Sequence, residues 1–253
     1  MSYAILFFAL GAILGSFYNV VGYRLPKGES LLYPSSHCPN CNHKLTPFEL
    51  IPIISFFLQG GKCTNCKKKI SWFYPIFESA CGLLFLLAYL KFGFTLDLIV
   101  PLTFISLIII IMVSDYEYMI ISDEVLIFFG ILLAIEIFFI YGWQALVTGI
   151  INGIISFVFM ILLKLLGDFM FKKESMGGGD IKLMFIFGLA LSYSAISINS
   201  IIAVVIGSFV GLPISLFVIL NKKDHEIPFG PLLGIGAIIL LLLGINVDII
   251  NIF

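Results

Sequence analysis

Charged residues are scarce in this sequence. They occupy 11% of its 253 positions, whereas hydrophobic residues occupy 60% and the mean hydropathy is +1.14. A soluble domain is typically about one quarter charged. The composition therefore excludes an ordinary water-soluble protein and predicts an all-α membrane protein with several spans.

Basic residues are missing ahead of the first apolar run. The first positive charge is Arg24, which follows the run, whereas a cleaved signal peptide usually begins with a basic segment. A signal peptide is the alternative, but we expect residues 1–22 to form a retained first transmembrane helix.

Long apolar runs recur along the whole chain. A helix needs about 20 residues to cross a hydrocarbon core of roughly 30 Å. Seven or eight spans are predicted, because the sixth run is short and its boundary with the seventh is poorly defined. The runs lie near 3–23, 75–91, 98–114, 124–141, 145–167, 181–193, 197–220 and 231–252.

The distribution of lysine and arginine predicts the orientation in the bilayer. Seven of the fourteen basic residues lie between the first two runs, and with eight spans only Lys91 falls on the opposite side from the other basic loops. Cytoplasmic loops accumulate positive charge. We therefore expect the first loop to be cytoplasmic, with both termini on the opposite side of the membrane.

Only one segment is polar enough to fold outside the bilayer. Residues 23–73 hold half of the basic residues, several prolines and four of the five cysteines. The sequence thus predicts three parts: a first helix over 1–22, a cytoplasmic domain over 23–73 and a transmembrane domain over 74–253.

The four cysteines of this loop form two CxxC pairs, Cys38/Cys41 and Cys63/Cys66, separated by 21 residues. Two such pairs supply four thiolates to a tetrahedral zinc ion. Two disulfides are the alternative, but the cytoplasm is reducing. We expect structural Zn²⁺, because a four-thiolate site leaves no position for a catalytic water.

Carboxylates are rare near the hydrocarbon and are therefore functional candidates. Asp115 ends the third run, and Asp180 follows three glycines before the sixth. The eight-span topology places both at the cytoplasmic face. Two aspartates that share a proton hydrolyse peptides by activating water and polarising the scissile carbonyl.

Simpler roles for the acidic residues stay open at this point. Asp123 and Asp180 are suitable N-cap residues for the helices that follow them. The Gly-rich stretch before Asp180 is also suited to phosphate binding, although the spacing and the GK[ST] element of a Walker motif are absent.

Several motifs together resemble one family, the type IV prepilin peptidases or leader peptidase/N-methyltransferases, which are GxGD-type membrane aspartyl proteases. They occur in the family's order along almost the whole chain. They are GSFYNV from Gly15 with YRLP from Tyr23, the cysteine tetrad, ISWFYP from Ile70 with Glu78, GGGD ending at Asp180, and IPFGP from Ile227. Tyr18 replaces the family's usual leucine, and Ser122 replaces the proline of its Ile-Pro-Asp.

This resemblance implies the chemistry of the site. Asp115 and Asp180 correspond to the two catalytic aspartates, which cut a basic leader from prepilins or pseudopilins. The resemblance also implies N-methylation of the new terminus with S-adenosylmethionine. It makes Glu78, Asn19, Arg24 and Glu49 candidates for the methyl-donor site, and a salt bridge to a loop lysine is the simpler role for Glu78.

Two competing functions are weighed against this one. The first is a peptidase without methylation, which the cysteine-bearing loop argues against. The second is a zinc-stabilised transporter, which needs carboxylates near the bilayer midplane, where Glu136 alone is expected. No nucleic-acid partner is expected, and the pilin substrate, the pathway and the oligomeric state stay open.

Overall fold

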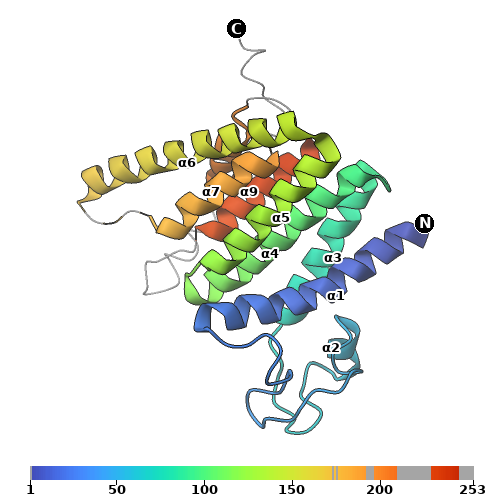
Figure 1. The fold of residues 1–253 in the computed structure, drawn as a ribbon. Helices are drawn as coiled ribbons and strands as arrows, with labels where there is room; N and C mark the ends of the chain where they lie inside the picture. Colours follow the sequence, from blue (N-terminus) through green and yellow to red (C-terminus); the bar gives the residue numbers. More distant parts are fainter. Residues whose placement is uncertain (1, 173, 175, 192–196, 210–228, 245–253) are drawn as a thin grey trace. The chain divides into compact units, whose positions relative to one another are not determined.

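The computed structural model describes residues 2–172, 174, 176–191, 197–209 and 229–244, and the regular elements of this described part are helices, apart from isolated β-bridges. The chain divides into two compact units, Met1–Phe94 and Thr95–Phe253. Each unit has its own packed helices, so they are described separately (Figure 1).

The first unit is built on two apolar helices, α1 (Ser2–Arg24) and α3 (Phe73–Phe92), which lie side by side. Glycines allow the two backbones to approach closely, as is common between membrane helices. A Cβ atom added at Gly11 would lie 2.7 Å from the Cys81 carbonyl oxygen, and one added at Gly82 would lie 2.9 Å from that of Phe8.

The polar insert between α1 and α3 contains little regular structure. The short 3₁₀ helix η1 (Leu25–Lys27) ends α1, and one helical turn, α2 (Ile54–Leu58), lies in the middle of the insert. Two isolated antiparallel bridges, His37 with Lys44 and Lys62 with Lys69, close the loops that carry the cysteines.

The second unit is a bundle of apolar helices. After a 3₁₀ turn, η2 (Leu96–Leu98), its elements are α4 (Ile99–Tyr118), α5 (Asp123–Tyr141), α6 (Trp143–Phe171), α7 (Gly178–Leu191), a helix over Asn199–Phe209, and α9 (Gly230–Leu243). Helix α4 is the most buried of the long helices, and it contacts α5, α7 and α9.

Close packing in this bundle again depends on small residues. A Cβ atom at Gly234 of α9 would lie 2.7 Å from Ile108 Cγ2 of α4, and one at Gly153 of α6 would lie 2.8 Å from the Phe185 carbonyl oxygen of α7. Glycine at these two positions therefore sets how closely the helices approach.

Within the described residues, five helices are long and apolar enough to cross a membrane, and the predicted count of seven or eight is not confirmed. Helices α7 and α9 have 14 residues each, or about 21 Å, which is short of a hydrocarbon core. Three predicted spans extend beyond the described residues: 181–193, 197–220 and 231–252. Ile227 and Pro228 of the IPFGP motif also lie outside the described residues.

The division into units differs from the three parts predicted from the sequence. Residues 74–92 belong to the transmembrane domain predicted over 74–253, yet α3 packs against α1 in the first unit. Hydropathy identifies a span but not its packing partner. The functions assigned to the predicted domains stay predictions.

Candidate active site and metal centre

The two cysteine loops of the insert repeat the same backbone hydrogen bonds. The Cys38 N–H donates to the His43 carbonyl, and the Cys63 N–H donates to the Lys68 carbonyl, both at 2.9 Å. In each loop the residue after the second cysteine has positive φ, 55° at Asn42 and 58° at Lys67. Each loop is therefore a tight knuckle that turns its two thiols to the same side.

The two knuckles bring the four thiols together. All four Sγ atoms lie within 4.8 Å of one another, with 3.8 Å between Cys38 and Cys66 and 3.9 Å between Cys41 and Cys63. A disulfide requires about 2.05 Å, so the cysteines are free thiols. Tetrahedral Zn–S bonds of about 2.3 Å give S–S edges of about 3.8 Å, so the cluster fits a metal ion.

Backbone and side-chain donors act on the thiols. The N–H of Lys68 and the Asn40 amide lower the pKa of Cys66 to about 6, and the N–H groups of Asn40 and Cys41 lower the pKa of Cys38. At Cys41 the His43 N–H lowers the pKa, but burial and neighbouring thiols outweigh it and raise it. Metal binding requires thiolates, which the first two shifts favour.

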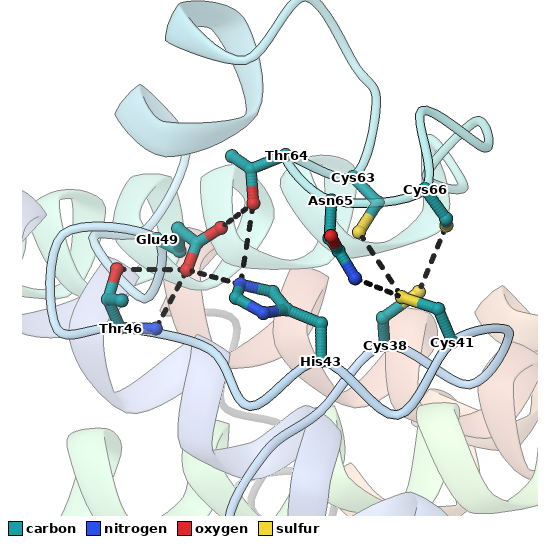
Figure 2. A network of polar contacts seen from close by, with 9 residues as sticks. All are labelled: Cys38, Cys41, His43, Thr46, Glu49, Cys63, Thr64, Asn65 and Cys66. Atoms are coloured by element: carbon teal, nitrogen blue, oxygen red, sulfur yellow. Dashed lines mark hydrogen bonds and ion pairs between the residues drawn. The ribbon is translucent and has the colours of Figure 1, made fainter.

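The Glu49 carboxylate connects the two knuckles (Figure 2). Its Oε2 accepts hydrogen bonds from the Thr46 N–H at 2.8 Å and the Thr46 hydroxyl at 2.9 Å, and lies 3.3 Å from His43 Nε2. Its Oε1 accepts from the Thr64 hydroxyl of the second knuckle. The Thr46 N–H and the Thr64 hydroxyl are the main causes that lower the pKa of Glu49 to about 2.

A cavity of about 670 Å³ lies between the insert and the ends of α1 and α3. This volume is typical of a site for a small organic ligand. All four candidate methyl-donor residues line it: Asn19, Arg24, Glu49 and Glu78. They come from α1, the first knuckle region and α3, and only the fold of the first unit brings them together.

Asn19 is the least satisfied polar side chain of this cavity. It is 2% exposed, and neither its amide nitrogen nor its amide oxygen has a hydrogen-bond partner in the described part of the chain. A buried polar group without a partner costs about 1–3 kcal/mol. An amide offers both a donor and an acceptor, so the cavity fits a ligand that has both.

The other two residues of the set have partners in the protein. The Arg24 guanidinium donates to the Ser30 carbonyl at 2.9 Å. The Glu78 carboxylate accepts from the Ile53 N–H at 2.8 Å and from the Ser16 hydroxyl. It forms no ion pair within the described residues, so a salt bridge to a loop lysine is not what the structure shows.

The contact with Glu78 holds an unusual backbone conformation. Ile53 precedes α2 with φ of 63° and ψ of −56°, a region that β-branched residues rarely adopt. Such conformations persist only where their surroundings fix them. Glu78 thus connects the transmembrane helix α3 to the insert at the edge of the cavity.

In the second unit, Asp115 and Asp180 form a buried acidic pair. Asp115 lies in the last turn of α4 and is 6% exposed, and Asp180 lies in the first turn of α7 and is 9% exposed. The two carboxylates are close enough to interact electrostatically. Asp180 lies inside α7, which begins at Gly178, so it does not occupy the N-cap position that the sequence left open.

Asp123 forms an ion pair with a lysine. Both of its carboxylate oxygens accept from Lys182 Nζ at 2.7 Å, and both side chains are more than half exposed. The N-cap of α5 is Ser122, not Asp123. Asp123 is therefore a surface ion-pair partner and not a helix cap.

The comparisons with known proteins match both units. The family model for the bacterial peptidase A24 N-terminal domain matches residues 9–92, and that for the type IV leader peptidase family matches residues 102–216. A prepilin leader peptidase/N-methyltransferase of Bacillus subtilis (strain 168) is 37% identical over 239 residues, which cover 94% of this chain and 93% of the relative. The chain belongs to the type IV leader peptidase family.

Other relatives in this leader peptidase family are more distant. The prepilin leader peptidase/N-methyltransferase of Myxococcus xanthus is 31% identical over 83% of this chain and 62% of the relative. That of Pseudomonas aeruginosa is 29% identical over 93% of this chain and 88% of the relative. No solved structure matches the chain.

Family membership identifies the chain as a membrane protease, which excludes the transporter alternative. Sequence reasoning missed the contacts that organise the sites. Glu49 contacts Thr64 of the other cysteine loop, and Asp123 contacts Lys182, which is 59 residues away. Local sequence patterns do not predict such long-range contacts.

Proposed function

We propose that this chain cleaves the basic leader of prepilins or pseudopilins with Asp115 and Asp180 as its catalytic pair. The interaction of these two buried carboxylates at adjoining helix ends carries the proposal. The relatives are named prepilin leader peptidases, and the type IV leader peptidase match covers most of the unit that contains the pair.

The pair acts by general acid–base catalysis. Two buried carboxylates that interact with each other can share one proton. The ionised member takes a proton from the attacking water, and the protonated member donates a hydrogen bond to the scissile carbonyl. The same two groups then return the proton to the leaving amine, so no cofactor is needed for cleavage.

Gly178, two residues before Asp180, leaves room for a substrate backbone. A Cβ atom added at Gly178 would meet nothing within 4 Å, whereas one added at Gly179 would lie 2.8 Å from Ile121 Cβ. We expect an extended peptide to approach over Gly178, and a larger side chain there would narrow this approach.

The substrate enters from the cytoplasmic side of the bacterial inner membrane. Positive residues concentrate in the insert, at four positions between 164 and 182, and at 222–223, which supports the cytoplasmic placement of these segments. A prepilin has its hydrophobic segment in the bilayer, so its scissile bond lies at the level of the helix ends that carry Asp115 and Asp180. The apolar segment packs against the bundle.

The second activity that we propose is N-methylation of the new terminus, with S-adenosylmethionine bound in the cavity of the first unit. The unpartnered amide of Asn19 carries this part of the proposal. Bound S-adenosylmethionine supplies an electrophilic methyl group. Asn19 would bind its polar edge, and the Glu78 carboxylate, which lines the same cavity, would accept a proton from the substrate amine.

The metal centre supports the cavity structurally. We assign Zn²⁺ to the four cysteines, since a Cys₄ set in tetrahedral geometry is typical of structural zinc. Cys38 and Cys63 also line the cavity. Holding the two knuckles together therefore shapes one wall of the proposed methyl-donor site.

Replacing each aspartate by asparagine tests the cleavage proposal. Full-length protein in membranes is incubated with a prepilin, and leader removal is followed by gel shift. Asp115→Asn and Asp180→Asn should each slow cleavage by at least about a hundredfold. Asp123→Asn, which breaks only an exposed ion pair, should cut at the parental rate. Near-normal cleavage by either of the first two variants refutes the pair.

A further inference from the structure

An exposed apolar face lies on the insert, beside the cavity of the proposed methyl-donor site, and Phe56, Lys69 and Ile70 line both the cavity and the hollow described below. Phe57 and Leu58 of α2 are 61% and 82% exposed, and Trp72 is 59% exposed. The Trp72 ring contacts those of Phe56 and Phe57, at centroid distances of 4.7 and 6.0 Å. Large side chains grouped in this way at a surface usually have a partner.

This face continues the exposed side of a transmembrane helix. Trp72 is the N-cap residue of α3, and its carbonyl accepts from the Ile76 N–H one turn later. Ile76 is exposed, and other exposed apolar residues follow at helical spacing on the same face of α3: Leu83, Leu87 and Leu90. Because α3 is long and apolar enough to cross a bilayer, this stripe is suited to contact lipid, and Trp72 lies at the end where an interfacial residue is expected.

Two lysines lie next to the apolar face without an opposite charge. Lys62 and Lys69 are direct partners in an antiparallel bridge, which places their side chains on the same side. Neither forms an ion pair or a side-chain hydrogen bond in the described part of the chain, and both are exposed. Like charges placed opposite each other repel unless an anion lies between them.

The lysines and the aromatic residues line one hollow. It has a volume of about 350 Å³, and its walls include Phe57, Gly60, Lys62, Lys69 and Trp72. Aromatic rings beside lysines are typical of the level at which headgroups meet acyl chains. Lysines near the inner leaflet are attracted to anionic lipids.

We propose that this hollow binds the phosphate headgroup of an anionic phospholipid, while Phe57, Leu58 and Trp72 insert at the boundary between headgroups and acyl chains. The lipid phosphate lies between Lys62 and Lys69 and offsets their repulsion. The site holds the insert, and with it the 670 Å³ cavity of the same unit, against the bilayer surface. The proposal depends on membrane insertion and on neither catalytic activity.

Tryptophan fluorescence tests this lipid site directly. The chain has two tryptophans, so Trp143→Phe leaves Trp72 as the sole reporter. The full-length variant is placed in nanodiscs of phosphatidylcholine and phosphatidylglycerol, with brominated acyl chains on one lipid and then on the other. At equal bromine content, Trp72 should be quenched more strongly when phosphatidylglycerol carries the bromine.

Neutralising the lysines should remove this headgroup preference. Lys62→Gln with Lys69→Gln should lower the relative affinity for phosphatidylglycerol by about fivefold for each lysine lost. The control, Lys44→Gln with Lys67→Gln, removes the same charge from exposed lysines outside the hollow and should keep the preference. Retained metal content shows that each variant is folded.

Three results would overturn the proposal. The first is equal quenching by the two brominated lipids, and the second is a preference that persists without Lys62 and Lys69. The third is quenching that is equal for both headgroups but falls when a prepilin is added. The substrate, and not lipid, would then cover the apolar face of the insert. None of these results affects the proposed peptidase, which is assayed by leader removal.

Discussion

The backbone N–H of Gly230 donates a 2.9 Å hydrogen bond to Oδ2 of Asp115. Gly230 is the first residue of α9, and Asp115 lies in the last turn of α4. The positive end of one helix thus contacts a carboxylate at the end of another. This contact orients one member of the proposed catalytic pair.

Gly230→Ala should disturb that contact. A Cβ atom there would lie 2.9 Å from Asp115 Oδ2 and 3.3 Å from Ile111 Cγ2, so either the carboxylate or α9 must shift. A displacement of this size at reacting groups typically costs about ten- to a hundredfold in rate. Leader removal by membranes containing equal amounts of protein measures the loss.

Gly130→Ala is the matched control for this substitution. Its Cβ atom would meet only Ile186, at 3.7 Å, which is ordinary contact, and alanine favours a helix over glycine. It should cleave at the parental rate. Equal activity of the Gly230 and Gly130 variants would show that α9 does not position Asp115.

The same contact shows where sequence reasoning succeeds and where it stops. Apolar runs located α1 and α3 to within about two residues, because hydropathy and helix length are local properties. The motif around Gly230 was recognised as a resemblance, but its partner 115 residues away was not. Glu49 was assigned to a ligand, yet its carboxylate is occupied by Thr46 and Thr64, which only the folded insert brings together.

Asn19→Leu should lower methylation while it raises the stability of the protein. Leucine has a similar size and removes a buried amide without partners, so the apparent melting temperature without ligand should rise. N-methylation of the cleaved product, followed by mass spectrometry, should fall by about tenfold or more, with leader cleavage unchanged. A variant that is less stable and methylates normally would contradict a ligand role for Asn19.

Removing the metal should also affect only one activity. The cysteines and the cavity belong to the first unit, and the aspartate pair belongs to the second. Cys63→Ser, or treatment with a strong chelator, should therefore abolish methylation and leave most leader cleavage intact. Metal content by mass spectrometry accompanies both assays, and Cys81→Ser, which changes a cysteine outside the cluster, is the control. Parallel loss of both activities would mean that the units depend on each other.

Glu49→Gln should speed metal loss from the four cysteines by the same factor over a wide pH range. Glutamine keeps the size of the side chain but removes the negative charge of the carboxylate. That carboxylate accepts hydrogen bonds from Thr46 and from Thr64 of the second knuckle. Contacts that orient a metal site are worth about ten- to a hundredfold in affinity, so metal loss to a chelator should be at least about tenfold faster. Glu29→Gln, an exposed glutamate of the same insert, is the control.

The pH dependence follows from the pKa of Glu49. Its value in the folded protein, about 2, lies below the ordinary 4.5. Its contribution to stability is therefore complete above pH 4.5 and is lost as pH falls towards 2. Between about pH 5.5 and 8 Glu49 stays ionised, because its pKa is about 2, so the ratio of metal-loss rates between Glu49→Gln and the parent should stay constant. A ratio that approaches one as pH falls across this range would mean that Glu49 is protonated near neutral pH, and the bridge between the knuckles would then be wrong.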